Sequence, residues 1–403
     1  MSVLSVGFAQ SGWKAIDSDA ESLLFSVKFI NSETGFISGQ YGTILKTSDS
    51  GENWVIKGTP TNQVLIAMCF INDAEGYACG TNGTILKTTD QGENWALLNQ
   101  VTNSSLNYVH FIDLDTGIIV GDNGTILRTS NRGVNWNIIP SPTSNHLSSI
   151  SFSDNFYGMA VGLEGTILAT SNSGIDWVSV PSPTYKNFHS VWNLQNGSTI
   201  IAGFPGTIFK TTTYGSSWIT QESNVGTSLR NIFFSNANTG YIAGYYGTIL
   251  KTVNGGVNWT PQSPPFSKHF YGVTFIDNNT GFIVGRDGTI LKTTNGGASV
   301  PINDPNAGLP RQFFLNQNYP NPFNPSTIIS FDVPYSSGYL GTRKISISIY
   351  DIRGKLIETI VNGDFASGSY NINWDARGVS SGIYFYKLIT DDLILTKKMI
   401  LLR

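Results

Sequence analysis

The sequence predicts an all-β protein made of a seven-bladed β-propeller followed by a small Ig-like β-sandwich. Three observations support this prediction: a 41-residue repeat that occurs seven times, strand patterns inside each repeat, and an abrupt change of pattern near residue 300. A unit of about 40 residues is typical of a four-stranded propeller blade. The 43 glycines and the 12% aromatic content suit a protein rich in turns and pleated strands.

The repeat is most visible in the hexapeptide GTILKT, which begins at Gly42. In the first unit we expect strands over residues 27–30, 35–39, 43–46 and 54–56, because these short apolar runs are separated by glycine-containing turns. No segment keeps a period of 3.6 residues, so helix is essentially absent. The hexapeptide recurs, with small changes, at Gly83, Gly124, Gly165, Gly206, Gly247 and Gly288.

An eight-residue string, TSDSGENW from Thr47 to Trp54, follows the hexapeptide and matches the Asp-box pattern S/T-x-D-x-G-x-x-W. We expect Asp49 to accept backbone N–H bonds inside the turn, Gly51 to take a positive φ, and Trp54 to fill the space between strands. The corresponding structural residues of the later boxes are Asp90, Gly92, Trp95, Trp136, Trp177, Trp218 and Trp259.

The acid of the Asp box is not kept in every copy. Asparagine replaces it at positions 131, 172, 254 and 295, and Thr213 takes its place in the fifth copy. A calcium site would need charged oxygen ligands, so these changes favour a turn-capping role over metal binding. The sequence predicts no metal site and no cofactor.

The seventh repeat is incomplete, because Val300 stands where the tryptophan should be. One period before Trp54 lies Trp13, a tryptophan with no blade in front of it. We therefore predict that the N-terminal strand around Trp13 completes the last blade and leaves no free sheet edge. The predicted propeller spans residues 10–300.

The two ends of the chain differ from the repeat. Residues 1–9 resemble the remnant of a signal peptide, with small residues at Gly7 and Ala9, although a disordered tail is the alternative. Residues 301–313 predict a linker rich in proline and asparagine. Residues 314–403 predict an independent module, because alternating strands there are bounded by glycine turns.

Both parts of the chain resemble known families. Residues 10–300, with their GTILKT and Asp-box motifs, resemble the photosystem II assembly factor-like propellers of the BNR/Asp-box group. Residues 314–403, with NYPNPFNP, YDIRG, SGIYFY and TKKMILL, resemble the C-terminal sorting domain of the type IX (Por) secretion system. The second resemblance implies type IX machinery as a partner and a secreted or outer cell-surface protein. An ordinary Ig-like adhesion module is the alternative for the tail.

Catalysis is tested against two classes of Asp-box enzyme, the sialidases and the xyloglucan-cleaving enzymes. The second class binds its glucan in a cleft between two propellers, and this sequence predicts only one propeller. A sialidase-like site needs three arginines, but the propeller has only Arg128, Arg132, Arg230 and Arg286, and the first two occupy framework positions. Glycoside hydrolysis needs two carboxylates about 5–10 Å apart, and the candidate acids lie on separate blades. The four histidines share no ligand spacing. We therefore predict a non-enzymatic protein, with a divergent glycoside hydrolase or assembly-factor activity on a membrane complex as alternatives.

A binding face is predicted from positions that vary between repeats. The loops joining the second and third strands, and those joining consecutive blades, share the face opposite the Asp boxes. Aromatic residues and arginine are typical of recognition hot spots and sugar-stacking platforms, so we expect a protein or glycan ligand here, although loop packing is the simpler alternative. The variable column is Phe25, Ile66, Asn107, Ser148, His189, Arg230 and Tyr271, and further candidates are Tyr41, Phe204, Tyr245, Tyr246 and Arg286.

Two remaining features bear on partners and compartment. The net charge of −3 gives no basic face for a nucleic acid, and no run of 18 apolar residues predicts a membrane-spanning helix. Cys69 and Cys79 are expected on neighbouring strands of the second blade, with Ile71 opposite Tyr77 and therefore Cys69 opposite Cys79. A disulfide is plausible in an oxidising compartment, and two buried thiols are the alternative.

Overall fold

A computed structural model describes residues 9–194, 197–301, 313–334, 342–391 and 393–402. The chain folds as two compact units, one of residues 11–300 and a second that contains the C-terminal residues. Most of the predicted leader, residues 1–8, and most of the predicted linker, residues 302–312, lie outside the described residues.

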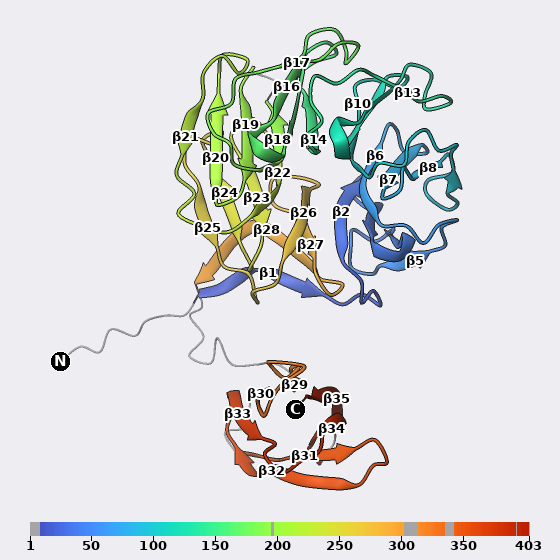
Figure 1. Ribbon diagram of the computed structural model, residues 1–403. Coiled ribbons are helices and arrows are strands. Elements are labelled where there is room, and N and C mark those ends of the chain that lie inside the picture. Colours follow the sequence, from blue (N-terminus) through green and yellow to red (C-terminus); the bar gives the residue numbers. More distant parts are fainter. Residues whose placement is uncertain (1–8, 195–196, 302–312, 335–341, 392, 403) are drawn as a thin grey trace, which may run out of the picture. The chain divides into compact units, whose positions relative to one another are not determined.

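The first unit is a β-propeller. Its described residues form seven four-stranded antiparallel sheets that follow one another around a ring (Figure 1). The first blade contains β2 (Leu24–Phe29), β3 (Gly35–Gly39), β4 (Ile44–Thr47) and β5 (Val55–Lys57), close to the predicted ranges. Short turns η1 (Gln40–Gly42), η2 (Asp122–Gly124) and η3 (Leu163–Gly165) join second and third strands in three blades.

The other blades repeat this order from the innermost to the outermost strand. The inner strands are β6 (Leu65–Phe70), β10 (Leu106–Phe111), β14 (Leu147–Phe152), β18 (Phe188–Asn193), β22 (Leu229–Phe234) and β26 (Phe270–Phe275). The second strands are β7 (Gly76–Gly80), β11 (Gly117–Gly121), β15 (Gly158–Gly162), β19 (Thr199–Gly203), β23 (Gly240–Gly244) and β27 (Gly281–Gly285). The third strands are β8 (Ile85–Thr88), β12 (Ile126–Thr129), β16 (Ile167–Thr170), β20 (Thr207–Thr211), β24 (Ile249–Thr252) and β28 (Ile290–Pro301). The outer strands are β9 (Ala96–Leu97), β13 (Asn137–Ile138), β17 (Val178–Ser179), β21 (Ile219–Gln221) and β25 (Thr260–Gln262).

The last blade is closed by the N-terminal strand, as predicted. Strand β1 (Ala9–Ile16) pairs with β28 in the order β1-β28-β27-β26 (Figure 1). Trp13 is 2% exposed and meets Tyr241 and Phe275 edge-on at ring-centroid distances of 6.5 and 5.9 Å. Trp54 meets Phe29 and Phe282 in the same geometry. Trp13 therefore fills the place that the Asp-box tryptophans fill in the other blades.

Neighbouring blades are also joined by the basic residue of the GTILKT motif. The Lys46 ammonium donates to the carbonyl of Gln91 in the next Asp-box turn at 2.7 Å. Arg128 occupies the same column and donates from Nε to the carbonyl of Ser173 at 2.9 Å. Arg132 pairs with Glu75 at 3.3 Å. These two arginines are therefore held by framework contacts.

The second unit is a β-sandwich with its own core. One sheet has the order β29 (Phe314–Leu315), β30 (Ser326–Val333), β33 (Gly368–Asp375), and the other β32 (Leu356–Phe365), β31 (Arg343–Asp351), β34 (Gly382–Ile389), β35 (Ile394–Leu401). Phe331 from the first sheet and Tyr386 from the second belong to one buried cluster. The Tyr386 hydroxyl donates to the carbonyl of Asn316 and accepts from the Asn318 N–H at 2.7 and 2.8 Å.

The Asp-box turns have the predicted geometry. Asp49 Oδ1 accepts bonds from the Asn53 N–H at 2.9 Å and the Thr47 hydroxyl at 2.8 Å, and Gly51 has φ +77°. In the third box Asn131 accepts the equivalent two bonds at 3.0 and 2.9 Å. An amide oxygen thus replaces the carboxylate without a change of turn. Among the described residues, no three His, Cys, Asp or Glu side chains gather as a metal site would require.

The predicted pairing of the two cysteines is wrong. Cys69 lies opposite Tyr77, Cys79 lies opposite Ala67, and both thiols are free. The connecting turn is set by Asn72, whose Oδ1 accepts the N–H groups of Ala74 and Glu75 at 2.9 and 2.8 Å. This turn is centred one residue earlier than predicted, and a shift of one residue in the centre moves the pairing by two.

Candidate functional site

The inner strand of every blade contains a β-bulge at the same position. In the first blade Leu24 pairs with Gly39 and Ser26 with Ser38, which leaves Phe25 as the extra residue. A bulge re-aims a side chain out of the regular alternation. The extra residues of the seven blades are Phe25, Ile66, Asn107, Ser148, His189, Arg230 and Tyr271, and they are the seven members of the variable column.

The glycine opposite each bulge explains why the backbone can adopt this shape. A Cβ on Gly39 would collide with the carbonyl oxygen of Leu23, and one on Gly162 would collide with that of His146. Glycine permits such close approach of two backbones because it has no side chain. The recurrent glycine at the end of the second strand is therefore part of the bulge.

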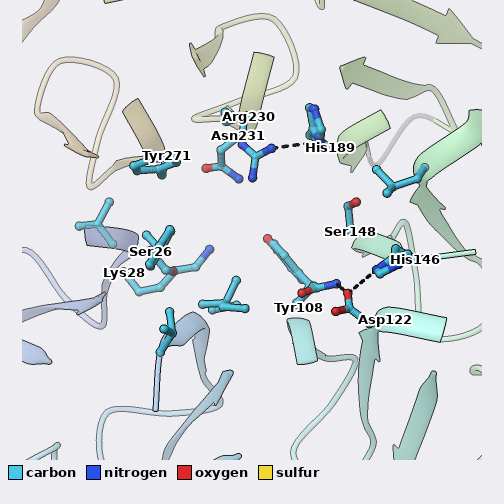
Figure 2. A pocket seen from close by; sticks show the side chains of 17 residues that line it. Ser26, Lys28, Tyr108, Asp122, His146, Ser148, His189, Arg230, Asn231 and Tyr271 are labelled. Carbon is cyan, nitrogen blue, oxygen red and sulfur yellow. Dashed lines mark hydrogen bonds and ion pairs between the residues drawn. The ribbon is translucent and has the colours of Figure 1, made fainter. Parts of the chain in front are cut away.

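All seven bulge residues line one cavity of about 340 Å3 (Figure 2). The cavity is central, because its lining comes from the inner strands of all seven blades. The side chains that meet there are chemically different at every one of the seven positions. Whether they bind a ligand stays a prediction, but the structure gives them a shared site.

One side of the cavity is built around Arg230. Its Nη1 lies 3.2 Å from Nδ1 of His189, and its guanidinium lies over the Tyr245 ring at 5.5 Å. Burial, followed by the charge of Arg230, lowers the pKa of His189 to about 3. His189 is therefore neutral near pH 7 and its Nδ1 serves as an acceptor for Arg230.

The opposite side carries Asp122, the only carboxylate among the described residues that line the cavity. Its Oδ1 lies 2.8 Å from Nδ1 of His146 and accepts a bond from the Asn107 amide, also at 2.8 Å (Figure 2). Asn107 donates as well to the carbonyl of Leu147 at 2.9 Å. Asp122 is thus held by Asn107 from β10 and by His146 from the loop that precedes β14.

An aromatic cluster forms the rim beside Arg230. The Tyr245 ring lies 4.4 Å from His269, 5.8 Å from Tyr271 and 6.4 Å from Tyr246, measured between centroids. The Tyr246 side chain is 66% exposed, and its backbone has φ +56°. A tyrosine in this left-handed conformation is unusual. The loop therefore projects Tyr246 into solvent at a modest conformational cost.

The remaining predicted site residues are outside the cavity lining. Tyr41 and Phe204 are exposed at 74% and 49% on other loops between second and third strands. Arg286 lies 3.5 Å from Asp287, which Lys268 also approaches at 3.7 Å. These loops belong to the same face, but they do not form one contiguous pocket with Arg230.

Sequence reasoning missed several lining residues. Lys28 and Tyr108 point into the cavity from β2 and β10 (Figure 2), and Asn231, Asp122 and His146 also line it. Tyr108 and Asn231 directly follow bulge residues. Because a bulge interrupts the alternation of sides, two consecutive residues can reach the same space. For Tyr108 and Asn231, the sequence position directly after the predicted variable column therefore also lines the cavity.

A second cavity of about 590 Å3 is lined by later residues of the inner strands. It shares Lys28 and Tyr108 with the first cavity. Its lining includes Cys69, His110 and Trp192. Burial, followed by the charge of Lys28, lowers the pKa of His110 to about 4, and burial raises the pKa of the Cys69 thiol. His110 is therefore neutral near pH 7, and the Cys69 thiol stays protonated.

The comparison with known families decides the assignment. Residues 7–95, 55–130 and 216–312 match the family described as photosynthesis system II assembly factor YCF48. The chain belongs to this family. Residues 317–402 match the secretion system C-terminal sorting domain. This YCF48-like propeller therefore carries a type IX sorting tail, which directs it to the medium or the outer cell surface.

Solved structures agree with the fold. A structure titled YCF48 bound to D1 peptide has a TM-score of 0.63 at 19% identity and covers 72% of this chain and 99% of its own. YCF48 from Cyanidioschyzon merolae gives 0.59 at 21% identity, with coverages of 70% and 98%. The WD40 repeats of RRP9 give 0.60 at only 7% identity, with coverages of 72% and 100%. The chain has no significant match among curated proteins. No helix among the described residues is long and apolar enough to cross a membrane.

Proposed function

We propose that this YCF48-like protein is an exported, non-catalytic binding propeller that docks a polypeptide on the face that carries the central cavity. The observation that carries the proposal is the set of seven bulges, which deliver seven different side chains to one cavity. A purely structural column would repeat the same side chain, as the buried tryptophans of the Asp boxes do. Because a bulge residue is unpaired in the strand register, its side chain can differ from blade to blade, which supports a role of this column in recognition.

The chemistry of the rim favours a polypeptide partner. Tyrosine and arginine dominate the residues that contribute most to protein–protein affinity. Tyr245, Tyr246 and Arg230 gather on one side of the cavity, with Tyr246 largely exposed. The solved YCF48 with a bound peptide has the same fold as this propeller, which supports the same use of this propeller.

The lining of the cavity favours binding over hydrolysis. Glycoside hydrolases use two carboxylates, whereas the described lining holds only Asp122, already engaged by His146 and Asn107. The described lining likewise holds a single arginine, Arg230, whereas Arg128 and Arg132 are held in the framework and Arg286 lies outside the lining. We therefore propose that the cavity recognises its ligand without changing it.

The proposal is tested by selecting peptides from a displayed random library against the full-length protein and screening a glycan array in parallel. We expect peptides to be enriched and to lose at least about tenfold in affinity when Tyr245 and Tyr246 are both changed to alanine. The matched control is Tyr214→Ala, since Tyr214 is 55% exposed on an Asp-box turn. Enrichment of glycans alone, or an equal loss from Tyr214→Ala, would contradict the proposal.

A further inference from the structure

Two cations face the central cavity without an anionic partner among the described residues. Lys28, from β2, and Arg230, from β22, both direct their charged ends inward (Figure 2). No described carboxylate lies within ion-pair distance of either one, whereas Lys46, Lys57 and Lys292 elsewhere in the propeller each reach a glutamate at 2.6–2.7 Å. These framework lysines are neutralised by a neighbour, and the two cavity cations are not.

The formal charges of the cavity lining do not cancel. Lys28 and Arg230 contribute two positive charges and Asp122 one negative charge, which leaves +1 when the histidines are counted as neutral. Asp122 lies at His146 and Asn107, not at Lys28 or Arg230. An excess of one positive charge inside a partly enclosed site favours a ligand group with one negative charge.

The hydrogen-bonding groups of the lining are mainly donors. Arginine has five N–H donors, and of those on Arg230 one meets His189 while Tyr245 covers the face of the guanidinium. Among the described residues, the other N–H groups of this guanidinium donate no hydrogen bond. The Asn231 side-chain oxygen accepts from the Val273 N–H at 3.0 Å, which leaves its NH2 group as a donor. The Tyr108 hydroxyl also lines the cavity.

We propose that the central cavity binds one carboxylate group between Lys28 and Arg230, with Tyr108 and Asn231 as additional hydrogen-bond donors. A planar monoanion matches both the fork of a guanidinium and the single excess charge. The carboxylate comes either from a small free acid or from an acidic side chain of a docked segment. Only for the second source does the inference rest on the proposed function.

The site is tested by isothermal titration of the full-length protein with benzoate and with benzamide, which have the same shape and differ in charge. Two blocked tripeptides, with glutamate or glutamine between tyrosines, form the second arm. We expect each carboxylate probe to bind at least about tenfold more tightly than its neutral partner, because charge-assisted hydrogen bonds are about twice as strong as neutral ones. Arg230→Gln and Lys28→Met should each abolish this preference.

Lys14→Met is the matched control, because Lys14 is exposed on β1 and does not line the cavity. If the cavity variants fail to fold, the unchanged protein still provides the answer, since benzoate should raise its melting temperature and benzamide should not.

Preference for benzoate alone supports the site with a free acid as its ligand, and preference for the glutamate peptide alone supports it with an acidic side chain. Equal binding of charged and neutral probes in both arms would overturn the site. A benzoate response without any selected peptide would leave the site standing and remove the proposed polypeptide partner.

Discussion

The two ends of each blade use the same repeated backbone in opposite ways. At the Asp-box end, Asp49 and Asn131 accept equivalent bonds, and buried tryptophans recur. At the cavity end, the bulge position holds seven different side chains. The difference teaches that repetition within one chain can separate residues that build the fold from residues available for recognition.

The largest expected effect is at the blade that the two ends of the propeller complete together. Trp13→Ala should lower the free energy of unfolding by about 3–5 kcal/mol, because it empties a buried aromatic site. Chemical denaturation measures the change, with Lys14→Ala as the exposed neighbour control. An unchanged stability would show that β1 does not close the last blade in solution.

The next effect concerns the glycine of the Asp box. Gly51 has φ +77°, and a Cβ there would collide with the Phe282 ring of the last blade. Gly51→Ala should therefore cost at least about 2 kcal/mol from backbone strain and overpacking. At Gly58 a Cβ would meet nothing within 4 Å, so Gly58→Ala should change the unfolding free energy by less than about 0.5 kcal/mol. Equal effects of the two substitutions would contradict this account of the turn.

The acid of the Asp box should make the stability of the fold depend on pH between about 4 and 2. Hydrogen bonds from the Asn53 backbone and side chain lower the pKa of Asp49 from 3.8 to about 2. A carboxyl whose folded pKa is depressed stabilises the fold above its unfolded pKa, and this contribution is lost as pH falls from about 4 to 2. Asp49→Asn should differ little from the wild type at pH 6 and should lose less stability between pH 4 and 2. Parallel denaturation curves for both proteins over that range would argue against the titration.

The smallest effect on stability is expected at the cavity face. Tyr246 has φ +56°, and the second and third blades have Asn82 and Asn123 at this position with φ +54° and +55°. Asparagine tolerates this conformation better than tyrosine, so Tyr246→Asn should leave the melting temperature equal or slightly higher. The same variant should weaken binding of any selected peptide. A marked fall in melting temperature would show that Tyr246 belongs to the framework.

The fold was predictable because its determinants are periodic. The offset between Trp13 and Trp54 equals one repeat, so the closing strand could be placed without coordinates. The pairing of Cys69 was not predictable to the residue, because the hydrogen bonds of Asn72 set the turn. The variable column was found by comparing repeats, but Tyr108 and Asn231 were missed because a bulge is a property of strand pairing and not of composition.

The bulges also separate two kinds of amino-acid substitution. A bulge residue has no partner on the neighbouring strand, so exchanging its side chain disturbs neither the ladder of hydrogen bonds nor the buried tryptophans. Seven such positions converge on one cavity. Their side chains can be randomised together, like the loops of an antibody, on a rigid scaffold that stays the same. The propeller therefore offers a compact framework for engineering new binding proteins, with a tail that exports them from the cell.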